Sequence, residues 1–188
     1  MQPLDDWELV ARAQRGDRQA FAELVRRYQD PVVHFCQRMV GPLQDAEDLA
    51  QEAFVRLHRH LPRLRPQAKF STFLFGVARN LALNHLRDGR RRGREGSQPL
   101  EALPLADIAQ PGPDRAARLR EIETLVAQCL EELSPEHREV LLLRDLQNMD
   151  YDSIAKIIHC RVGTVKSRIA RAREQLRLRL IERGGDLL

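Results

Sequence analysis

Residues 150–173 read DYDSIAKIIHCRVGTVKSRIARAR and contain two short helical patterns joined by a tight turn. Asp150 is a typical N-cap residue for the first helix, whose apolar face holds Ile154, Ala155, Ile157 and Ile158. The second helix is expected to begin near Val162, and its apolar positions fall at helical spacing: Val165, Ile169 and Ala172. Its cations point elsewhere: Lys166, Arg168, Arg171 and Arg173. This layout predicts a helix-turn-helix with a basic recognition helix.

A basic amphipathic helix is often only a solvated face, so the pattern alone leaves that alternative open. Gly163 and Thr164 at the start of the second helix favour DNA binding. Glycine lets the backbone approach a phosphate closely, and the threonine hydroxyl adds a donor beside a helix N-terminus, which attracts anions. Duplex DNA is therefore the expected partner of this segment.

The composition predicts a soluble, nearly all-helical protein. Of the 188 residues, 43% are hydrophobic and 31% are charged, and runs of β-branched residues are scarce. No apolar run approaches the ~20 residues of a membrane span, and the N-terminus MQPLDDWELV lacks the pattern of a secretory signal. We therefore expect a cytoplasmic protein without direct membrane insertion.

Charge is unevenly distributed along the chain, although the net charge is only +4. Residues 87–94 and 161–179 are basic, whereas Asp45, Glu47, Asp48 and Glu52 form an acidic stretch. Because an acidic surface repels DNA phosphates, this stretch indicates a second partner besides DNA. We expect that partner to be a basic protein. The alternative is a solvated helix whose N-terminal acidic residues complement the helix dipole.

The cysteine and histidine spacings predict no metal site and no cofactor. Cys36, Cys129 and Cys160 are far apart and odd in number, which is typical of neither a disulfide framework nor a zinc ribbon. Cys36 and Cys129 are expected to be buried as small apolar residues. The chain also lacks a Walker-type loop or a nucleophile–base motif, so we expect no catalytic residues and no enzymatic activity.

Turn and capping signals divide the chain into two small helical domains. Helices are expected over residues 5–15, 45–61 and 72–88, the last capped by Ser71. Between the first two, Asp17 can cap the next helix, and Pro31 starts or kinks a further one. Residues 93–113 contain four prolines and three glycines and predict a flexible linker. Further helices are expected over residues 114–133 and 136–146, the latter opened by Ser134 and Pro135. The predicted domains are residues 1–92 and 114–188.

Three motifs in this order resemble the bacterial RNA polymerase sigma factors of the extracytoplasmic-function group, in the sigma-70 family. Residues 45–61, DAEDLAQEAFVRLHRHL, are similar to the helix of this family that binds core polymerase. Residues 69–92, KFSTFLFGVARNLALNHLRDGRRR, are similar to its −10 recognition and melting segment. Residues 133–174, which include the helix-turn-helix, are similar to its −35-binding domain. The resemblance covers almost the whole chain.

The resemblance implies roles for individual residues. Those matching the polymerase-binding motif are Asp45, Glu47, Asp48, Gln51 and Glu52. Residues expected near the bases of the −10 element are Leu64, Arg65, Lys69, Asn80 and Asn84, and those expected on its phosphates are Arg79, Arg87, Arg90 and Arg91. For the −35 element, Lys166, Ser167 and Arg171 are expected at base edges, and Thr164, Arg168 and Arg173 at phosphates.

Aromatic residues in the −10 segment have a simpler alternative role. Phe73 stands where the family usually has tryptophan, so a stacking or indole hydrogen-bonding role is not carried over to it. Core packing is the alternative for Phe70, Phe73 and Phe75.

The implied function is promoter choice and strand opening by a sigma factor. The implied partners are the clamp helices of the largest subunit of core RNA polymerase, the flap of the second-largest subunit, promoter DNA and an anti-sigma factor. The main alternative is a free-standing helix-turn-helix regulator, which predicts tight duplex binding without polymerase. A helical enzyme using histidine and cysteine is a third class, and the motif at residues 45–61 favours the sigma factor over both.

Overall fold

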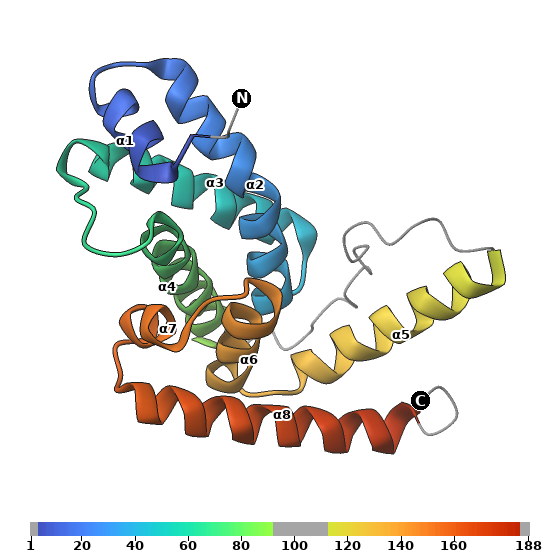
Figure 1. The fold of residues 1–188 in the computed structure, drawn as a ribbon. Coiled ribbons are helices and arrows are strands. Elements are labelled where there is room, and N and C mark those ends of the chain that lie inside the picture. Colours follow the sequence, from blue (N-terminus) through green and yellow to red (C-terminus); the bar gives the residue numbers. More distant parts are fainter. Residues whose placement is uncertain (1–3, 92–112, 185–188) are drawn as a thin grey trace.

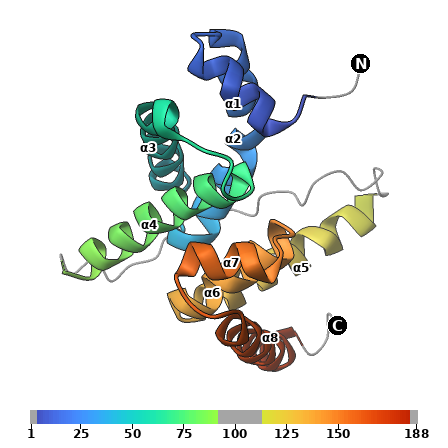
Figure 2. The same ribbon diagram turned by 60° about the vertical axis from the view of Figure 1, so that its left-hand side comes forward.

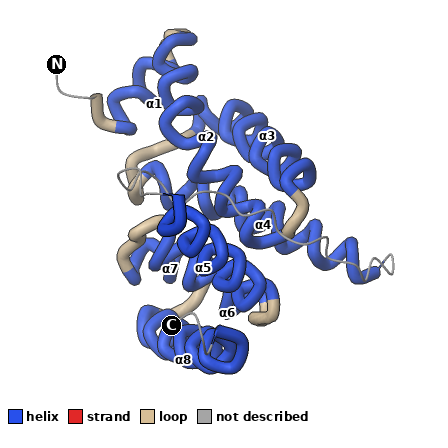
Figure 3. The backbone as a smooth tube through the Cα atoms, turned by 90° about the vertical axis from the view of Figure 1, so that its right-hand side faces the viewer, coloured by secondary structure: helices blue, strands red, loops and turns tan. Residues whose placement is uncertain are grey.

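The computed structural model describes residues 4–91 and 113–184, and every regular element within these ranges is helical (Figure 3). The N-terminal half contains α1 (Asp6–Gln14), α2 (Arg18–Val40), α3 (Leu43–His60), a 3₁₀ turn (Leu61–Arg63) and α4 (Phe70–Arg91). The C-terminal half contains α5 (Pro113–Glu131), α6 (Pro135–Leu141), a π-helical segment (Leu142–Leu146), α7 (Tyr151–Ile158) and α8 (Val162–Gly184). The expected all-α fold is confirmed, while the expected linker falls almost wholly outside the described residues.

Capping side chains begin the helices where the sequence places them. Asp17 accepts hydrogen bonds from the backbone amides of Gln19 and Ala20 at the start of α2. Asp150 accepts from the amide of Ser153 at the start of α7, and Ser134 accepts from that of His137 at the start of α6. Each side chain satisfies an amide that has no partner within its helix.

The core of the N-terminal half joins α2, α3 and α4. Phe35 of α2 meets Phe75 of α4 edge to face, with ring centroids 5.5 Å apart, and both side chains are fully buried. Cys36 is buried beside them, and burial raises the pKa of its thiol to about 12. Cys129 of α5 is also buried. The expectation that Cys36 and Cys129 act as small apolar core residues is confirmed.

Three local predictions differ from the structure. Pro31 does not start a helix, the first of the two alternatives predicted for it, because it lies inside α2, which continues through Val32 and Phe35, both fully buried. Ser71 is not an N-cap, because α4 begins one residue earlier at Phe70, which packs against Trp7 and Tyr28. The predicted helix over residues 136–146 widens into a π-helical turn after Leu141. The buried ring of Phe70 explains the earlier start of α4, since tertiary packing can override a local capping signal.

The helix-turn-helix forms as predicted from α7 and α8. His159 ends α7 in the left-handed conformation, with φ of 53°, and its backbone amide donates to the carbonyl of Ala155. α8 begins at Val162, and its inward residues are all buried: Val165, Ile169 and Ala172. Lys166, Ser167 and Arg171, which lie between them, are exposed, as a DNA reader requires.

The two halves pack directly on each other. α4 lies against α7, and α2 contacts both α5 and α6 (Figures 1 and 2). No helix in the described ranges is long and apolar enough to cross a membrane.

Candidate protein and nucleic-acid interfaces

The acidic residues of α3 lie on the side opposite its buried face. Ala46, Ala50, Ala53 and Leu57 are buried at i, i+4 and i+7 spacing. At 100° per residue, the predicted polymerase-binding residues occupy the opposite arc of the helix: Asp45, Glu47, Asp48, Gln51 and Glu52. Glu47, Asp48 and Gln51 are exposed, while Glu52 receives a hydrogen bond from Arg56 at 2.8 Å. The helix therefore presents a continuous acidic surface.

Sequence reasoning missed Val55, which lies on the same side of α3, one turn beyond Gln51 and Glu52. Its side chain is 37% exposed, although it is a large hydrophobic residue. A single exposed apolar residue is normal on a protein surface, so the acidic residues carry the assignment of this face. Asp45 lies at the edge of the arc, where its carboxylate is 3.3 Å from the imidazole of His85 on α4. The sequence signal that could have placed Val55 on this face is its position four residues after Gln51, since residues at that spacing share one face of a helix.

The loop between α3 and α4 is held against α1 by long-range hydrogen bonds. The indole of Trp7 donates to the carbonyl of Ala68 at 3.0 Å. The amide of Gln14 donates to the carbonyls of Leu61 and Leu64 at 2.8 and 3.0 Å. Trp7 and Gln14 are thus positioning residues that the sequence did not reveal.

A cavity of about 470 Å³ lies between this loop, α4 and α7. Leu64, Arg65, Lys69 and Asn80 line it, so the structure brings together four of the five residues predicted near the bases. Leu64 is also 9% exposed and belongs to the hydrophobic core. Asn84 is exposed one turn beyond Asn80, outside the cavity lining.

Two further residues of α4 give this cavity its chemistry. Phe73 is half-buried and lines it, whereas Phe70 and Phe75 are buried in the core. Core packing is therefore confirmed for Phe70 and Phe75. Thr72 also lines the cavity, and its hydroxyl oxygen is buried without a hydrogen-bond partner. Aromatic, cationic and amide groups together suit an unstacked nucleobase.

The four arginines predicted to contact −10 phosphates differ in accessibility. Arg87, Arg90 and Arg91 are exposed near the C-terminal end of α4. Arg79 is only 15% exposed, and its guanidinium donates to both carboxylate oxygens of Glu139 on α6, at 2.8 and 3.2 Å. Burial raises the pKa of Glu139 above its ordinary value, and the hydrogen bond from Arg79 opposes that shift.

The residues predicted for the −35 element share the outer face of α8, and most of them are exposed. Thr164, Lys166, Ser167 and Arg171 are exposed along about two turns. Arg173 is exposed but pairs with Asp145. Arg168 is half-buried, and its guanidinium is 3.7 Å from Glu139 and 4.0 Å from Glu136. The surface that would enter a major groove is therefore centred on Lys166, Ser167 and Arg171.

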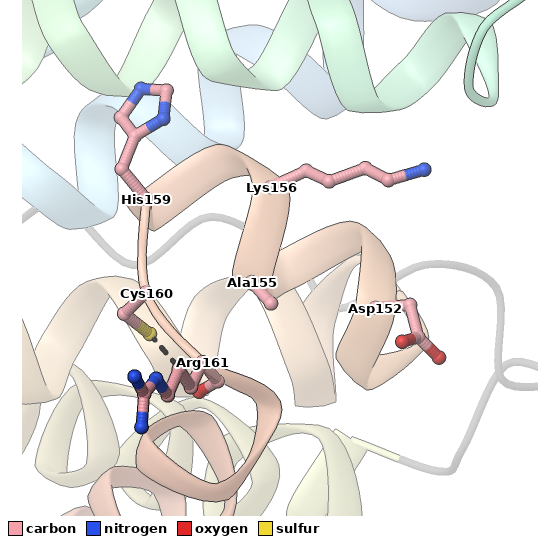
Figure 4. A pocket seen from close by; sticks show the side chains of 6 residues that line it. All are labelled: Asp152, Ala155, Lys156, His159, Cys160 and Arg161. Carbon is pink, nitrogen blue, oxygen red and sulfur yellow. Dashed lines mark hydrogen bonds between the residues drawn. The ribbon is translucent and has the colours of Figure 1, made fainter.

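The turn between α7 and α8 contains a histidine and a cysteine that are adjacent in the sequence, His159 and Cys160. Figure 4 shows that His159 points toward α4, whereas Cys160 points toward the backbone of Arg161. The thiol of Cys160 donates a hydrogen bond to the carbonyl oxygen of Arg161 at 3.4 Å. Asp152 lies at the opposite end of α7. Within the described residues, no group of three or more histidine, cysteine or acidic side chains could hold a metal ion.

Comparison with known proteins assigns both halves to one family. Residues 24–92 match the family description Sigma-70 region 2, and residues 123–176 match Sigma-70, region 4. The RNA polymerase sigma-H factor of Pseudomonas aeruginosa is 39% identical, covering 91% of each chain. The ECF RNA polymerase sigma-E factor of Escherichia coli K12 is 38% identical, covering 92% of this chain and 93% of the relative.

Solved structures show the same arrangement of helices. CnrH in complex with the cytosolic domain of CnrY superposes with a TM-score of 0.69 at 27% identity, covering 95% of this chain and 98% of that chain. The sigma factor RpoE of Bartonella quintana, solved in complex with the anti-sigma factor NepR, has a TM-score of 0.66 at 22% identity, covering 85% of this chain and 96% of that chain, and supports the fold.

An exposed acidic face on α3, together with exposed cations on α4 and α8, is the arrangement expected of a transcription initiation factor. The chain belongs to the sigma-70 family of RNA polymerase sigma factors and is of the extracytoplasmic-function type. Members of this family are non-catalytic initiation factors.

Proposed function

We propose that the chain binds core RNA polymerase through α3, selects promoters through α8 and captures the opened −10 strand at the cavity beside α4. The observation that carries this proposal is the acidic face of α3 formed by Asp45, Glu47, Asp48 and Glu52, on a chain whose other predicted surfaces are basic. The clamp helices of the largest subunit are the proposed partner of this arc, and the flap of the second-largest subunit that of the C-terminal half. Residues 1–92 and 114–188 are the proposed functional units.

In this role the chain contributes binding free energy and carries out no step of the reaction. Unstacking bases costs a few kcal/mol per step, and stacking of a captured base on an aromatic side chain returns about 1–3 kcal/mol. Phe73 and Asn80 are the proposed contacts of that base, while Arg87, Arg90 and Arg91 hold the backbone. The polymerase performs the reaction, so the chain itself is proposed to have no enzymatic activity and to act in the cytoplasm.

An anti-sigma factor is the proposed regulator. CnrH and the Bartonella quintana sigma factor RpoE, both similar to this chain in fold, were solved in complex with CnrY and with the anti-sigma factor NepR respectively. A protein of this class would act by covering the polymerase-binding surfaces.

The decisive experiment is transcription in vitro with purified core polymerase, the full chain and a genomic promoter library. We expect chain-dependent transcripts that share two upstream motifs at a fixed spacing. Duplex binding by the chain alone, without core binding or chain-dependent transcripts, would instead support a free-standing regulator.

Reversal of one charge on α3 tests the polymerase interface. We expect Asp48→Lys to weaken binding to core polymerase about tenfold or more, because it places a cation in an acidic surface that faces a basic partner. Binding is measured by fluorescence anisotropy of the labelled chain. Glu23→Lys, the same change on α2 at a position paired with Arg26, is the control and is expected to have little effect. Equal affinities of the two variants would contradict the assignment.

Truncation of Arg171 tests the −35 surface. A bidentate arginine–guanine contact is worth about 1–3 kcal/mol of discrimination. We therefore expect Arg171→Ala in the holoenzyme to lose preference at one −35 base pair, with little change at the others. Arg177→Ala, which removes a cation paired with Glu174 further along α8, is the control. Loss of discrimination by less than twofold in Arg171→Ala would count against the assignment.

A further inference from the structure

Trp7 is the only tryptophan of the chain, and it lines the cavity beside α4. It belongs to α1 and precedes the residues that match the family description, which begin at residue 24. Its side chain is half-buried, so part of the indole ring remains accessible. The hydrogen bond to the loop between α3 and α4 accounts for the indole nitrogen, but it does not account for the place of the ring in the cavity.

Two contacts fix the indole ring in place. The ring nitrogen donates a hydrogen bond to the carbonyl of Ala68 at 3.0 Å. The ring is also nearly perpendicular to that of Phe70, at 89°, with the two centroids 6.3 Å apart, and Phe70 is itself buried in the core. A side chain that is already held loses little conformational entropy when a ligand contacts it. The part of the ring that lines the cavity is therefore preorganised for binding.

The helix α4 contributes an aromatic and an amide side chain to the same cavity. Phe73 and Asn80 line it, and Gly76 lies between them on the same face of the helix. A Cβ atom added at Gly76 would lie in open space, so packing does not require glycine at this position. Glycine inside a helix is destabilising relative to alanine. The missing side chain leaves room for a ligand at a cost to the helix.

The cavity has the size and the lining of a site for a nucleobase. Its volume of about 470 Å³ lies within the range of roughly 300–1,000 Å³ that is typical of small-molecule sites. Trp7 and Phe73 provide two aromatic rings, and any base can stack on an aromatic ring because every base has a π-face. Arg63 and Arg65 of the loop also line the cavity and add positive charge, which attracts the phosphates that flank a base.

We propose that Trp7 is a further contact residue of the captured −10 base, with its indole ring forming an aromatic wall of the cavity in addition to Phe73. This proposal rests on the proposed function, because it adds a residue to the same base-capture site. It gives α1 a direct part in strand capture, since the indole nitrogen holds the loop while the indole ring binds the base.

Two substitutions of Trp7 in the holoenzyme separate these two roles. The probe is fluorescein-labelled fork DNA with a single-stranded −10 element, carrying the promoter found by transcription in vitro, and binding is measured by anisotropy. Trp7→Gln removes the ring but keeps an amide donor for the carbonyl of Ala68, and we expect it to weaken binding about tenfold. Trp7→Phe keeps a ring but removes the donor, and we expect a loss of less than about threefold. An equal or larger loss in Trp7→Phe would overturn the proposal.

Abasic nucleotides test whether the ring contacts a base. One nucleotide of the −10 element at a time is replaced by an abasic site, which removes the base and keeps the backbone. We expect the loss caused by Trp7→Gln to fall below about twofold at one position only, because its stacking partner is then absent. A loss of the same size at every position would overturn the proposal, since Trp7 would then only hold the loop. The matched control is Phe21→Leu on α2, whose ring contacts His58 outside the cavity lining, and it should show no such dependence.

A second measurement keeps the test decisive if Trp7→Gln does not fold by circular dichroism. In the wild-type complex, 5-iodouracil replaces each −10 base in turn, and ultraviolet light crosslinks it to an aromatic side chain in contact with it. We expect a crosslink to the peptide that contains Trp7, identified by mass spectrometry, and its absence at every position would refute the base contact. Lack of any chain-dependent binding to fork DNA would refute the proposed function as well, whereas binding that is insensitive to Trp7 would refute only the contact.

Discussion

Phe35→Ala is expected to lower the free energy of unfolding of the N-terminal half by about 3–5 kcal/mol. Phe35 is fully buried on α2 and meets Phe75 of α4 edge to face. Truncation removes the transfer free energy of the ring, loses the aromatic contact and leaves a cavity between helices that are fixed by other packing. Urea unfolding followed by circular dichroism measures the effect as a lower midpoint at unchanged slope.

Phe35→Leu is the control for this prediction. Leucine keeps most of the apolar volume, so its cost should be well below that of alanine. A loss below about 1 kcal/mol for Phe35→Ala would show that the helices close over the vacated space. In that case the core between α2 and α4 would not be the rigid support on which the cavity beside α4 depends.

Arg138→Met is expected to destabilise the C-terminal half by about 2–4 kcal/mol. The Arg138 side chain is buried and donates to four backbone carbonyls, those of Leu130, Glu131, Leu133 and Met39. These carbonyls belong to the end of α5, the turn that follows it, and α2. Methionine fills similar volume but leaves the carbonyls without a donor, which is costly in a buried site. Thermal and urea unfolding of the full chain measure the loss.

The effect of Arg138→Met should depend on pH. Burial raises the pKa of Glu131 above 4.5, and the charge of Arg138 partly offsets that rise. Without Arg138 the pKa in the folded state rises further. A carboxyl group whose pKa is higher in the folded state than in the unfolded state favours folding at pH values below its unfolded-state pKa. This contribution to the free energy of unfolding is lost as the pH rises through the folded-state pKa. The destabilisation should therefore be smaller at pH 4 than at pH 7.

Arg177→Met provides the matched control for Arg138→Met. Arg177 is exposed on α8 and pairs with Glu174 one turn away, so its replacement should leave the stability of the chain nearly unchanged at either pH. Similar losses for the two variants, or a larger loss for Arg138→Met at pH 4, would contradict the role given to the buried guanidinium.

The sequence alone determined the elements whose causes are local. Three residues cap their helices: Asp17, Ser134 and Asp150. In each, a side-chain oxygen accepts a hydrogen bond from a backbone amide two or three residues later, which is a contact that the local sequence specifies. The buried face of α8 follows from spacing within one helix. The order of three motifs also sufficed to identify the family, because each motif is contiguous in the chain. Local signals failed at Ser71, which is not the N-cap of α4, and in the alternative that Pro31 starts a helix, because Pro31 lies inside α2.

Only the tertiary structure decided which of the predicted residues are free to bind. Arg79, Lys69 and Arg168 look alike in sequence to the exposed Arg87 and Arg171, yet each of the three faces a carboxylate of the C-terminal half. Glu139 was unremarkable in the sequence because its partners on α4 and α8 lie far from it along the chain. Contacts of this kind depend on how two amphipathic layers pack, and no periodicity within a single helix specifies that packing. The sequence therefore predicted two DNA-binding surfaces, and the packing of the halves determined that each predicted surface has a cation held by the same buried carboxylate, that of Glu139.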